Sequence, residues 1–95
     1  MTAATALKII RSCVNAGRVI LKDHFVERMA QRGIFWSDVL SIIDAPHGLR
    51  TDGDDKFGRE RWFIAGDAPD GLRLEILCVI DEDEPTTIFI TMYWE

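Results

Sequence analysis

Three stretches rich in β-forming residues decide the fold of this 95-residue chain. They are Arg59–Ala65 (RERWFIA), Leu72–Ile80 (LRLEILCVI) and Thr86–Trp94 (TTIFITMYW). Short, turn-forming segments at residues 66–71 and 81–85 join them, and short connections favour antiparallel neighbours. The sequence therefore predicts an antiparallel meander, with residues 49–57 as a candidate fourth strand at its edge.

Side chains alternate between the two faces of a strand, so these stretches also predict what each face carries. We expect the helices to cover Ile88, Ile90, Met92 and Trp94, and the opposite face to carry Thr87, Phe89, Thr91 and Tyr93. The uncovered face would then gather Arg61, Arg73, Glu75, Thr91 and Tyr93. Cations between aromatic rings suit single-stranded nucleic acid, although ordinary sheet-surface roles explain the same residues.

Helical spacing and helix-ending residues describe the first half of the chain. Apolar residues recur at helical intervals from Ala3 to Val14, and Gly17 supplies a stop. An extended stretch, Val19–Leu21, precedes a helix with Asp23 as its N-cap that ends at Gly33, and a third helix runs from Ser37 to Pro46. We predict one α+β domain over residues 1–95, with two to three N-terminal helices packed on one face of a three- to four-stranded antiparallel sheet.

Charge is unevenly distributed along the chain. The net charge is −5, yet residues 1–32 hold six basic and two acidic side chains, a net +4 that leaves −9 on the rest. This imbalance can direct an anionic ligand to one face or prepare the chain for a complementary protein. Without an apolar run long enough to span a bilayer or a signal-peptide pattern, we expect a cytoplasmic protein that does not bind membranes. Cys13 and Cys78 lie in apolar contexts and are expected to be reduced core residues.

His24, Arg28 and Arg32 are the candidate catalytic residues, because residues four apart are neighbours on a helix surface. Cleavage of an RNA phosphodiester without a metal needs a proton-transfer group and cations on the phosphate. We predict His24 in the first role and the two arginines in the second, with help from Tyr93 or Arg61. The alternative is a solvated helix face. The acidic segments at 52–55 and 81–84 lack the spacing of a metal loop, so we predict no metal and no cofactor.

The order of these residues resembles a family of small bacterial proteins known as domain of unknown function 4258. The resemblance rests on His24, Arg28 and the run Arg32-Gly33-Ile34, and on the later segments Trp62–Gly66, Gly71–Leu74 and Ile88–Tyr93. The chain departs from the family pattern at Phe35 and Trp36, which separate Ile34 from the capping residue Ser37. Such proteins are similar to the RelE-type toxin and barnase-like ribonuclease architecture.

The resemblance implies a metal-independent ribonuclease of the toxin type with a cognate antitoxin. It makes His24, Arg28 and Arg32 the first-choice site residues and Thr91 and Tyr93 the second. Arg61, Arg73 and Thr91 are the candidate substrate-binding residues for RNA. The alternative function is a non-catalytic protein-interaction module of the same fold, which could form a homodimer through its C-terminal strand if that strand lies at the sheet edge.

Overall fold

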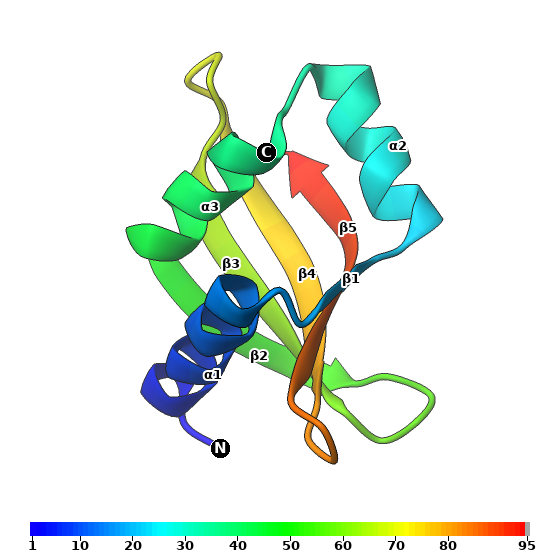
Figure 1. The fold of residues 1–95 in the computed structure, drawn as a ribbon. Coiled ribbons are helices and arrows are strands. Elements are labelled where there is room, and N and C mark those ends of the chain that lie inside the picture. Colours follow the sequence, from blue (N-terminus) through cyan, green and yellow to red (C-terminus); the bar gives the residue numbers. More distant parts are fainter. Residues whose placement is uncertain (95) are drawn as a thin grey trace.

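The computed structural model describes residues 1–94, which form three helices and five strands (Figure 1). In chain order they are α1 (Ala3–Ala16), β1 (Val19–Leu21), α2 (Asp23–Arg32), α3 (Trp36–Asp44), β2 (Gly48–Asp54), β3 (Glu60–Asp67), β4 (Arg73–Asp81) and β5 (Thr86–Trp94). The predicted α+β class is confirmed. The candidate edge strand is confirmed as β2.

The sheet is mixed rather than antiparallel, and the prediction of three to four antiparallel strands is wrong. Its strand order is β1-β5-β4-β3-β2, in which β2 to β5 form the predicted meander and β1 runs parallel to β5. The segment Val19–Leu21 was expected to be extended, but three residues do not specify a partner that lies at the other end of the chain. Because β1 pairs with Thr87–Phe89, this part of the C-terminal strand does not lie at the edge of the sheet. Glu95 lies outside the described residues.

The helix ends follow local capping chemistry. The backbone N–H of Thr5 donates to Oγ1 of Thr2 (3.2 Å), and Gly17 ends α1 in the left-handed region at φ 73°. The N-cap of α2 is Lys22 rather than the predicted Asp23, which is the first helical residue. Helix α3 begins at Trp36, one residue before the predicted Ser37, because Asp38 Oδ2 accepts a hydrogen bond from the backbone N–H of Phe35 (2.8 Å).

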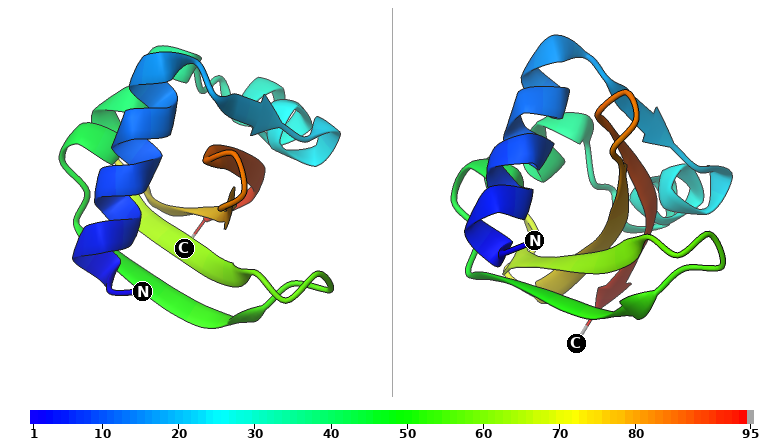
Figure 2. Two further views of the ribbon diagram at one scale, coloured as in Figure 1. Left: turned by 60° about the horizontal axis from the view of Figure 1, so that its bottom comes forward. Right: turned by 90° about the horizontal axis from the view of Figure 1, so that it is seen from below.

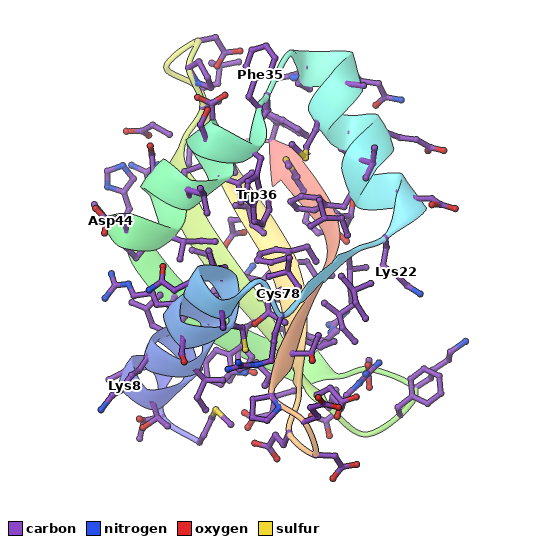
Figure 3. The ribbon with its side chains drawn as sticks, viewed as in Figure 1. Lys8, Lys22, Phe35, Trp36, Asp44 and Cys78 are labelled. Carbon is purple, nitrogen blue, oxygen red and sulfur yellow. The ribbon has the colours of Figure 1, made fainter. Side chains whose placement is uncertain are left out.

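All three helices pack on one face of the twisted sheet (Figure 2). The core between them contains Trp62 and Ile64 of β3, Leu74 and Ile76 of β4, and Phe89 of β5. Figure 3 shows Trp36 and Cys78 in this layer, whereas Lys8 and Lys22 point into solvent. No helix within residues 1–94 is long and apolar enough to cross a membrane.

A register shift in β5 changes which of its side chains face the helices. Leu77 pairs with Thr91 but the next residue, Cys78, pairs with Phe89, so Ile90 forms a bulge. As a result Thr87 and Phe89 are fully buried beneath the helices, together with Met92. The predicted faces are therefore correct for Met92 and Trp94 and wrong for Thr87 and Phe89.

Candidate functional site

The predicted residues His24, Arg28 and Arg32 lie along α2, which packs beside β5 (Figure 1). Residues four apart in a helix are displaced by about 40° around its axis, so these three side chains, the α2 row, stay near one side of the helix. His24 and Arg32 are exposed and Arg28 is half-buried, and the guanidinium carbon of Arg32 lies 4.5 Å from the centre of the Trp94 ring. The α2 row therefore runs along the border between solvent and core.

Two apolar side chains of α2 hold this border in place. Phe25 is fully buried and its ring centre lies 5.4 Å from that of Phe89, while Met29 packs against the same core. Their spacing of four residues gives α2 a narrow apolar stripe, with Arg28 and Arg32 along the same side of the helix. The packing of Phe25 and Met29 thus fixes the position of both arginines relative to β5.

Most arginines of the chain already have a partner. Arg11 donates to the carbonyls of Ile43 and Asp44, Arg18 to that of Pro85, and Arg61 to that of Asp52. Ion pairs join Arg50 to Glu75, Arg59 to Asp55, and Arg73 to Asp67. Arg28 and Arg32 differ from these six, since neither makes a hydrogen bond or an ion pair with any residue in the range 1–94.

Two buried donors at this position lack an acceptor among the described residues. They are Nε of Arg28 and the indole Nε1 of Trp94. Nearly all buried polar groups in folded proteins are hydrogen-bonded, so such atoms point to water or to a ligand. Sequence reasoning missed Trp94 because its position in an alternating strand assigns it to the core, and nothing in the pattern marks its N–H as unsatisfied.

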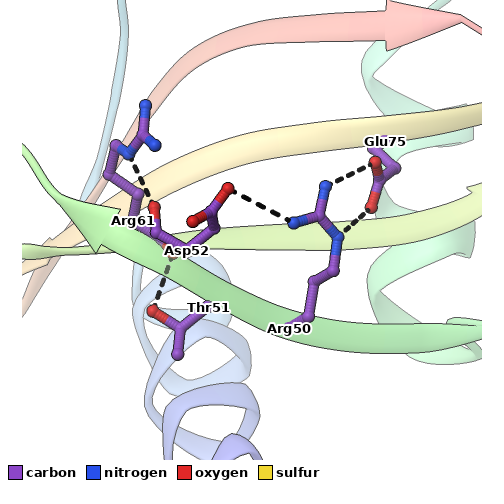
Figure 4. Close-up of polar contacts among 5 residues, drawn as sticks. All are labelled: Arg50, Thr51, Asp52, Arg61 and Glu75. Atoms are coloured by element: carbon purple, nitrogen blue, oxygen red, sulfur yellow. Dashed lines mark hydrogen bonds and ion pairs between the residues drawn. The ribbon is translucent and has the colours of Figure 1, made fainter.

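The outer face of the sheet, opposite the helices, carries the remaining predicted residues. Tyr93 is 47% exposed, and its ring centre lies 6.3 Å from that of Phe63. Arg50 forms two hydrogen bonds of 3.0 Å with Glu75 and lies 4.3 Å over the Phe63 ring (Figure 4). The hydrogen bonds to the Glu75 carboxylate raise the pKa of Arg50 further.

Arg61 and Thr91 also belong to this outer face. Arg61 Nε donates to the Asp52 carbonyl (2.8 Å; Figure 4), and its guanidinium carbon lies 5.7 Å from the centre of the Phe63 ring. Thr91 is buried and its Oγ1 has no hydrogen-bond partner among the described residues. The outer face thus combines aromatic rings with arginines whose donors are largely engaged inside the protein.

Arg73 belongs to a further cluster at the end of β3 and the start of β4. Nε of Arg73 lies 3.6 Å from one oxygen of Asp67, and Nε2 of His47 lies 2.8 Å from the other. The hydrogen bond from His47, together with the Arg73 charge, lowers the pKa of Asp67. His47, the residue before β2, is therefore tied to the end of β3.

The structure thus groups the predicted residues into separate places. His24, Arg28 and Arg32 share one helix, whereas Arg61, Arg73, Thr91 and Tyr93 belong to the other side of the sheet. Tyr93 follows the alternation of β5 and points away from the face on which Trp94 meets Arg32. The roles of Tyr93, Thr91, Arg61 and Arg73 stay predictions, without a contact to the α2 row.

Two hollows lie elsewhere on the surface. One of about 440 Å³ is bordered by Phe57, Arg59, Trp62 and Asp81. Another of about 560 Å³ lies between α1 and α3, beside Arg11, Trp36 and Asp44. Neither includes a residue of the α2 row.

Metal-ligating and nucleophilic side chains are not clustered in the part of the chain that the structure describes. Within residues 1–94 no group of three or more His, Cys, Asp and Glu is arranged to hold a metal ion. Cys13 and Cys78 are both free and buried. Burial raises the pKa of the Cys78 thiol to about 12, so this thiol stays protonated near neutral pH.

Comparison with known proteins identifies a family for most of the chain. No curated protein and no solved structure matches the chain. A family model described as Domain of unknown function (DUF4258) matches residues 21–94, which include α2, α3, the strands β2 to β5 and the last residue of β1. The chain therefore belongs to the family described as Domain of unknown function (DUF4258).

Proposed function

We propose that this protein is a metal-independent ribonuclease of the toxin type, with its site on α2. The observation that carries the proposal is a difference in hydrogen bonding and ion pairing among the arginines. Six are held by carbonyl or carboxylate groups, whereas Arg28 and Arg32 lie one helical turn apart, follow His24, and have no such partner within residues 1–94. Two positively charged side chains beside an imidazole are suited to binding and cleaving a phosphodiester.

The proposed roles follow from the exposure of each side chain. His24 is exposed and takes the proton of the attacking 2′-hydroxyl, or gives a proton to the 5′-oxygen that leaves. Arg28 and Arg32 hold the phosphate and stabilise the negative charge that grows on its oxygens during attack. The ring of Trp94 keeps the Arg32 guanidinium at a fixed place, which reduces the entropy lost on binding.

The fold supports this proposal through resemblance. Helices packed on one face of a strand meander are similar to the RelE-type toxin and barnase-like ribonuclease architecture, although here the sheet has a parallel edge strand. A toxin of this kind is held inactive by an antitoxin, and we propose that such a partner would cover the exposed side of α2. Fold-level resemblance alone does not define an activity, so the test lies with the site residues.

The direct test is cleavage of a mixture of single-stranded RNAs by purified protein in the presence of a chelator. We expect His24→Ala to lower the cleavage rate by about 10²- to 10⁴-fold, because loss of a general acid or base has effects of this size. Arg28→Ala should reduce cleavage as well. Lys8→Ala removes one positive charge from the solvent-exposed side of α1 and is the matched control, with a rate equal to that of the unmodified protein.

Expression in a bacterial host gives a second measurement of the same proposal. Growth arrest relieved by His24→Ala but not by Lys8→Ala supports the toxin. Intact RNA together with harmless expression would contradict it, as would a His24→Ala variant with nearly full activity.

A second candidate function is a non-catalytic protein-interaction module. The outer face of the sheet favours it, because its arginines are engaged internally and its Tyr93 and Ile20 are each 47% exposed. The net charge of −5 also opposes broad attraction to RNA. Under this function RNA stays intact, and substitutions on the outer face rather than on α2 abolish partner binding.

A further inference from the structure

The contact between α2 and the end of β5 contains two buried N–H groups from different elements. Arg28 contributes Nε and Trp94 contributes Nε1, and neither has an acceptor within residues 1–94. A buried donor left without a hydrogen bond destabilises the folded state, because it has lost its hydrogen bonds to water and gained none in return. Two such groups at one contact are unusual, and both lack the same thing, which is an acceptor oxygen.

The positions of these donors are linked by Arg32. Its guanidinium lies over the Trp94 ring, and Arg28 is one turn earlier on the same side of α2. The Trp94 ring is further fixed by its backbone, since Trp94 pairs with Leu74 in the sheet and its side chain packs against the core. Arg28 and Trp94 are thus linked through Arg32, which lies one helical turn after Arg28 and over the Trp94 ring.

We propose that Trp94 is a ligand-binding residue, whose indole N–H and the Nε–H of Arg28 donate to oxygens of one phosphate group. This inference rests on the proposed function, because it assigns the phosphate of an RNA phosphodiester as the ligand of the α2 row. It extends the site from a helix surface to a junction between α2 and β5.

The chemistry of the junction selects an oxyanion. The two unpartnered atoms of the junction are both donors, and the guanidiniums of Arg28 and Arg32 add two positive charges that form no ion pair within residues 1–94. A phosphodiester provides two non-bridging oxygens, each able to accept more than one hydrogen bond.

The indole N–H also has a role that charge alone cannot supply. A guanidinium attracts any nearby anion, whereas a single N–H fixed by the sheet is satisfied only by an oxygen at one position. Trp94 would therefore orient the phosphate relative to His24, and Arg28 and Arg32 would provide most of the attraction.

The test uses the indole N–H signals of the three tryptophans in a ¹H–¹⁵N NMR spectrum. The probe is a short single-stranded oligonucleotide with 2′-deoxy sugars, which binds without cleavage because it lacks the attacking hydroxyl. Trp94→Phe identifies the Trp94 signal by its loss. We expect that signal to shift during titration of the unmodified protein, while the signals of Trp36 and Trp62 stay in place.

Two variants measure the two donors separately, and a third variant is the control. Trp94→Phe keeps a ring beneath Arg32 but removes the N–H, and Arg28→Lys keeps the charge but removes Nε. Each should weaken oligonucleotide binding about tenfold, as expected for a hydrogen bond to a charged group. Trp36→Phe is the matched control, because Trp36 packs edge-on against Phe89 and should leave binding unchanged.

The outcomes separate this inference from the proposed function. If the oligonucleotide binds and Arg28→Ala weakens binding, but the Trp94 signal does not shift and Trp94→Phe binds normally, the role of Trp94 is wrong and the α2 site stands. If the unmodified protein does not bind the oligonucleotide at all, both are wrong. If Trp94→Phe fails to fold, Trp36→Phe and Trp62→Phe assign the other two signals, so the Trp94 signal follows by elimination and the spectrum of the unmodified protein still decides the matter.

Discussion

At the residue scale, the partners of a charged side chain decide whether it supports the fold or is available to a ligand. Arg59 is an example of the first kind, since it donates to Asp55 from both its side chain (2.8 Å) and its backbone (2.9 Å). Arg28 is an example of the second, because its buried Nε has no acceptor within residues 1–94. Both are arginines in a polar stretch of sequence, and only their surroundings distinguish them.

Asp55 gives a prediction about pH at this scale. Burial raises the pKa of its carboxyl, but hydrogen bonds from Arg59 and Phe57 and the charge of Arg59 outweigh burial and lower it below the usual 3.8. A carboxyl whose pKa is lower in the folded state stabilises the protein above the unfolded value, and this contribution disappears as pH falls through the folded value. Asp55→Asn should therefore destabilise the protein at pH 7 and have little effect at a pH below both values.

Urea unfolding of both proteins between neutral and strongly acidic pH measures this difference. Asp54→Asn is the matched control, because Asp54 is exposed and makes no side-chain hydrogen bond or ion pair in the described part of the chain. A stability difference for Asp55→Asn that is the same at all pH values would show that the Asp55 charge is not the cause.

At the element scale, close approach of helices to the sheet fixes where the site lies. Helix α3 packs so tightly on β3 that a Cβ at Gly66 would stand 2.6 Å from Cγ2 of Ile42. The C-terminal carbonyls of the same helix accept hydrogen bonds from Arg11 of α1. These contacts hold α3 in place. Its residue Trp36 packs edge-on against Phe89, which lies beneath α2.

Gly66→Ala should consequently destabilise the fold by about 1 to 3 kcal/mol, the usual range for overpacking a well-filled core. Ile42→Ala in the same chain removes both Cγ atoms that the new Cβ would meet, so the double variant should lose less stability than the sum of the two single variants. Chemical denaturation of the unmodified protein, the two single variants and the double variant measures the coupling energy between the two substitutions. Strict additivity would contradict a direct clash between these two residues.

At the scale of the whole molecule, the charge distribution confines attraction for nucleic acid to a small area. The chain carries −5 overall, and the arginines outside α2 are engaged in hydrogen bonds or ion pairs within the described residues. A ligand that meets only Arg28 and Arg32 displaces few counterions. The molecule as a whole therefore favours a local phosphate contact over a broad basic surface.

This confinement predicts a weak dependence of RNA binding on salt. For single strands the slope of log K against log salt is about −0.7 per phosphate neutralised, so two contacts give about −1.4. Fluorescence polarisation of the 2′-deoxy oligonucleotide over a series of KCl concentrations measures the slope. Arg28→Ala should bring it to about −0.7, whereas Lys8→Ala should leave it unchanged. A much steeper slope would indicate that other basic groups bind the strand.

The sequence by itself determined the features that depend on near neighbours in the chain. Helical spacing and the stop at Gly33 predicted α2, and turn-forming segments predicted the meander from β3 to β5. The alternation in β3 and β4 correctly placed Arg61, Arg73 and Glu75 on the uncovered face, since their neighbours Trp62, Ile64, Leu74 and Ile76 belong to the core. These features are local because hydrogen bonds within a helix or a tight turn involve residues close together in sequence.

Only the tertiary structure decided the features that depend on distant pairing. The partner of β1 is β5, at the far end of the chain, and the bulge at Ile90 turned Phe89 toward the helices against the expected alternation. The same holds for the α2 row: the sequence placed His24, Arg28 and Arg32 on one helix, but the fold stacked Arg32 on Trp94 and left Arg28 without an acceptor among residues 1–94. Burial and hydrogen bonding of a side chain arise from all the elements packed around it, and spacing along one element cannot specify them.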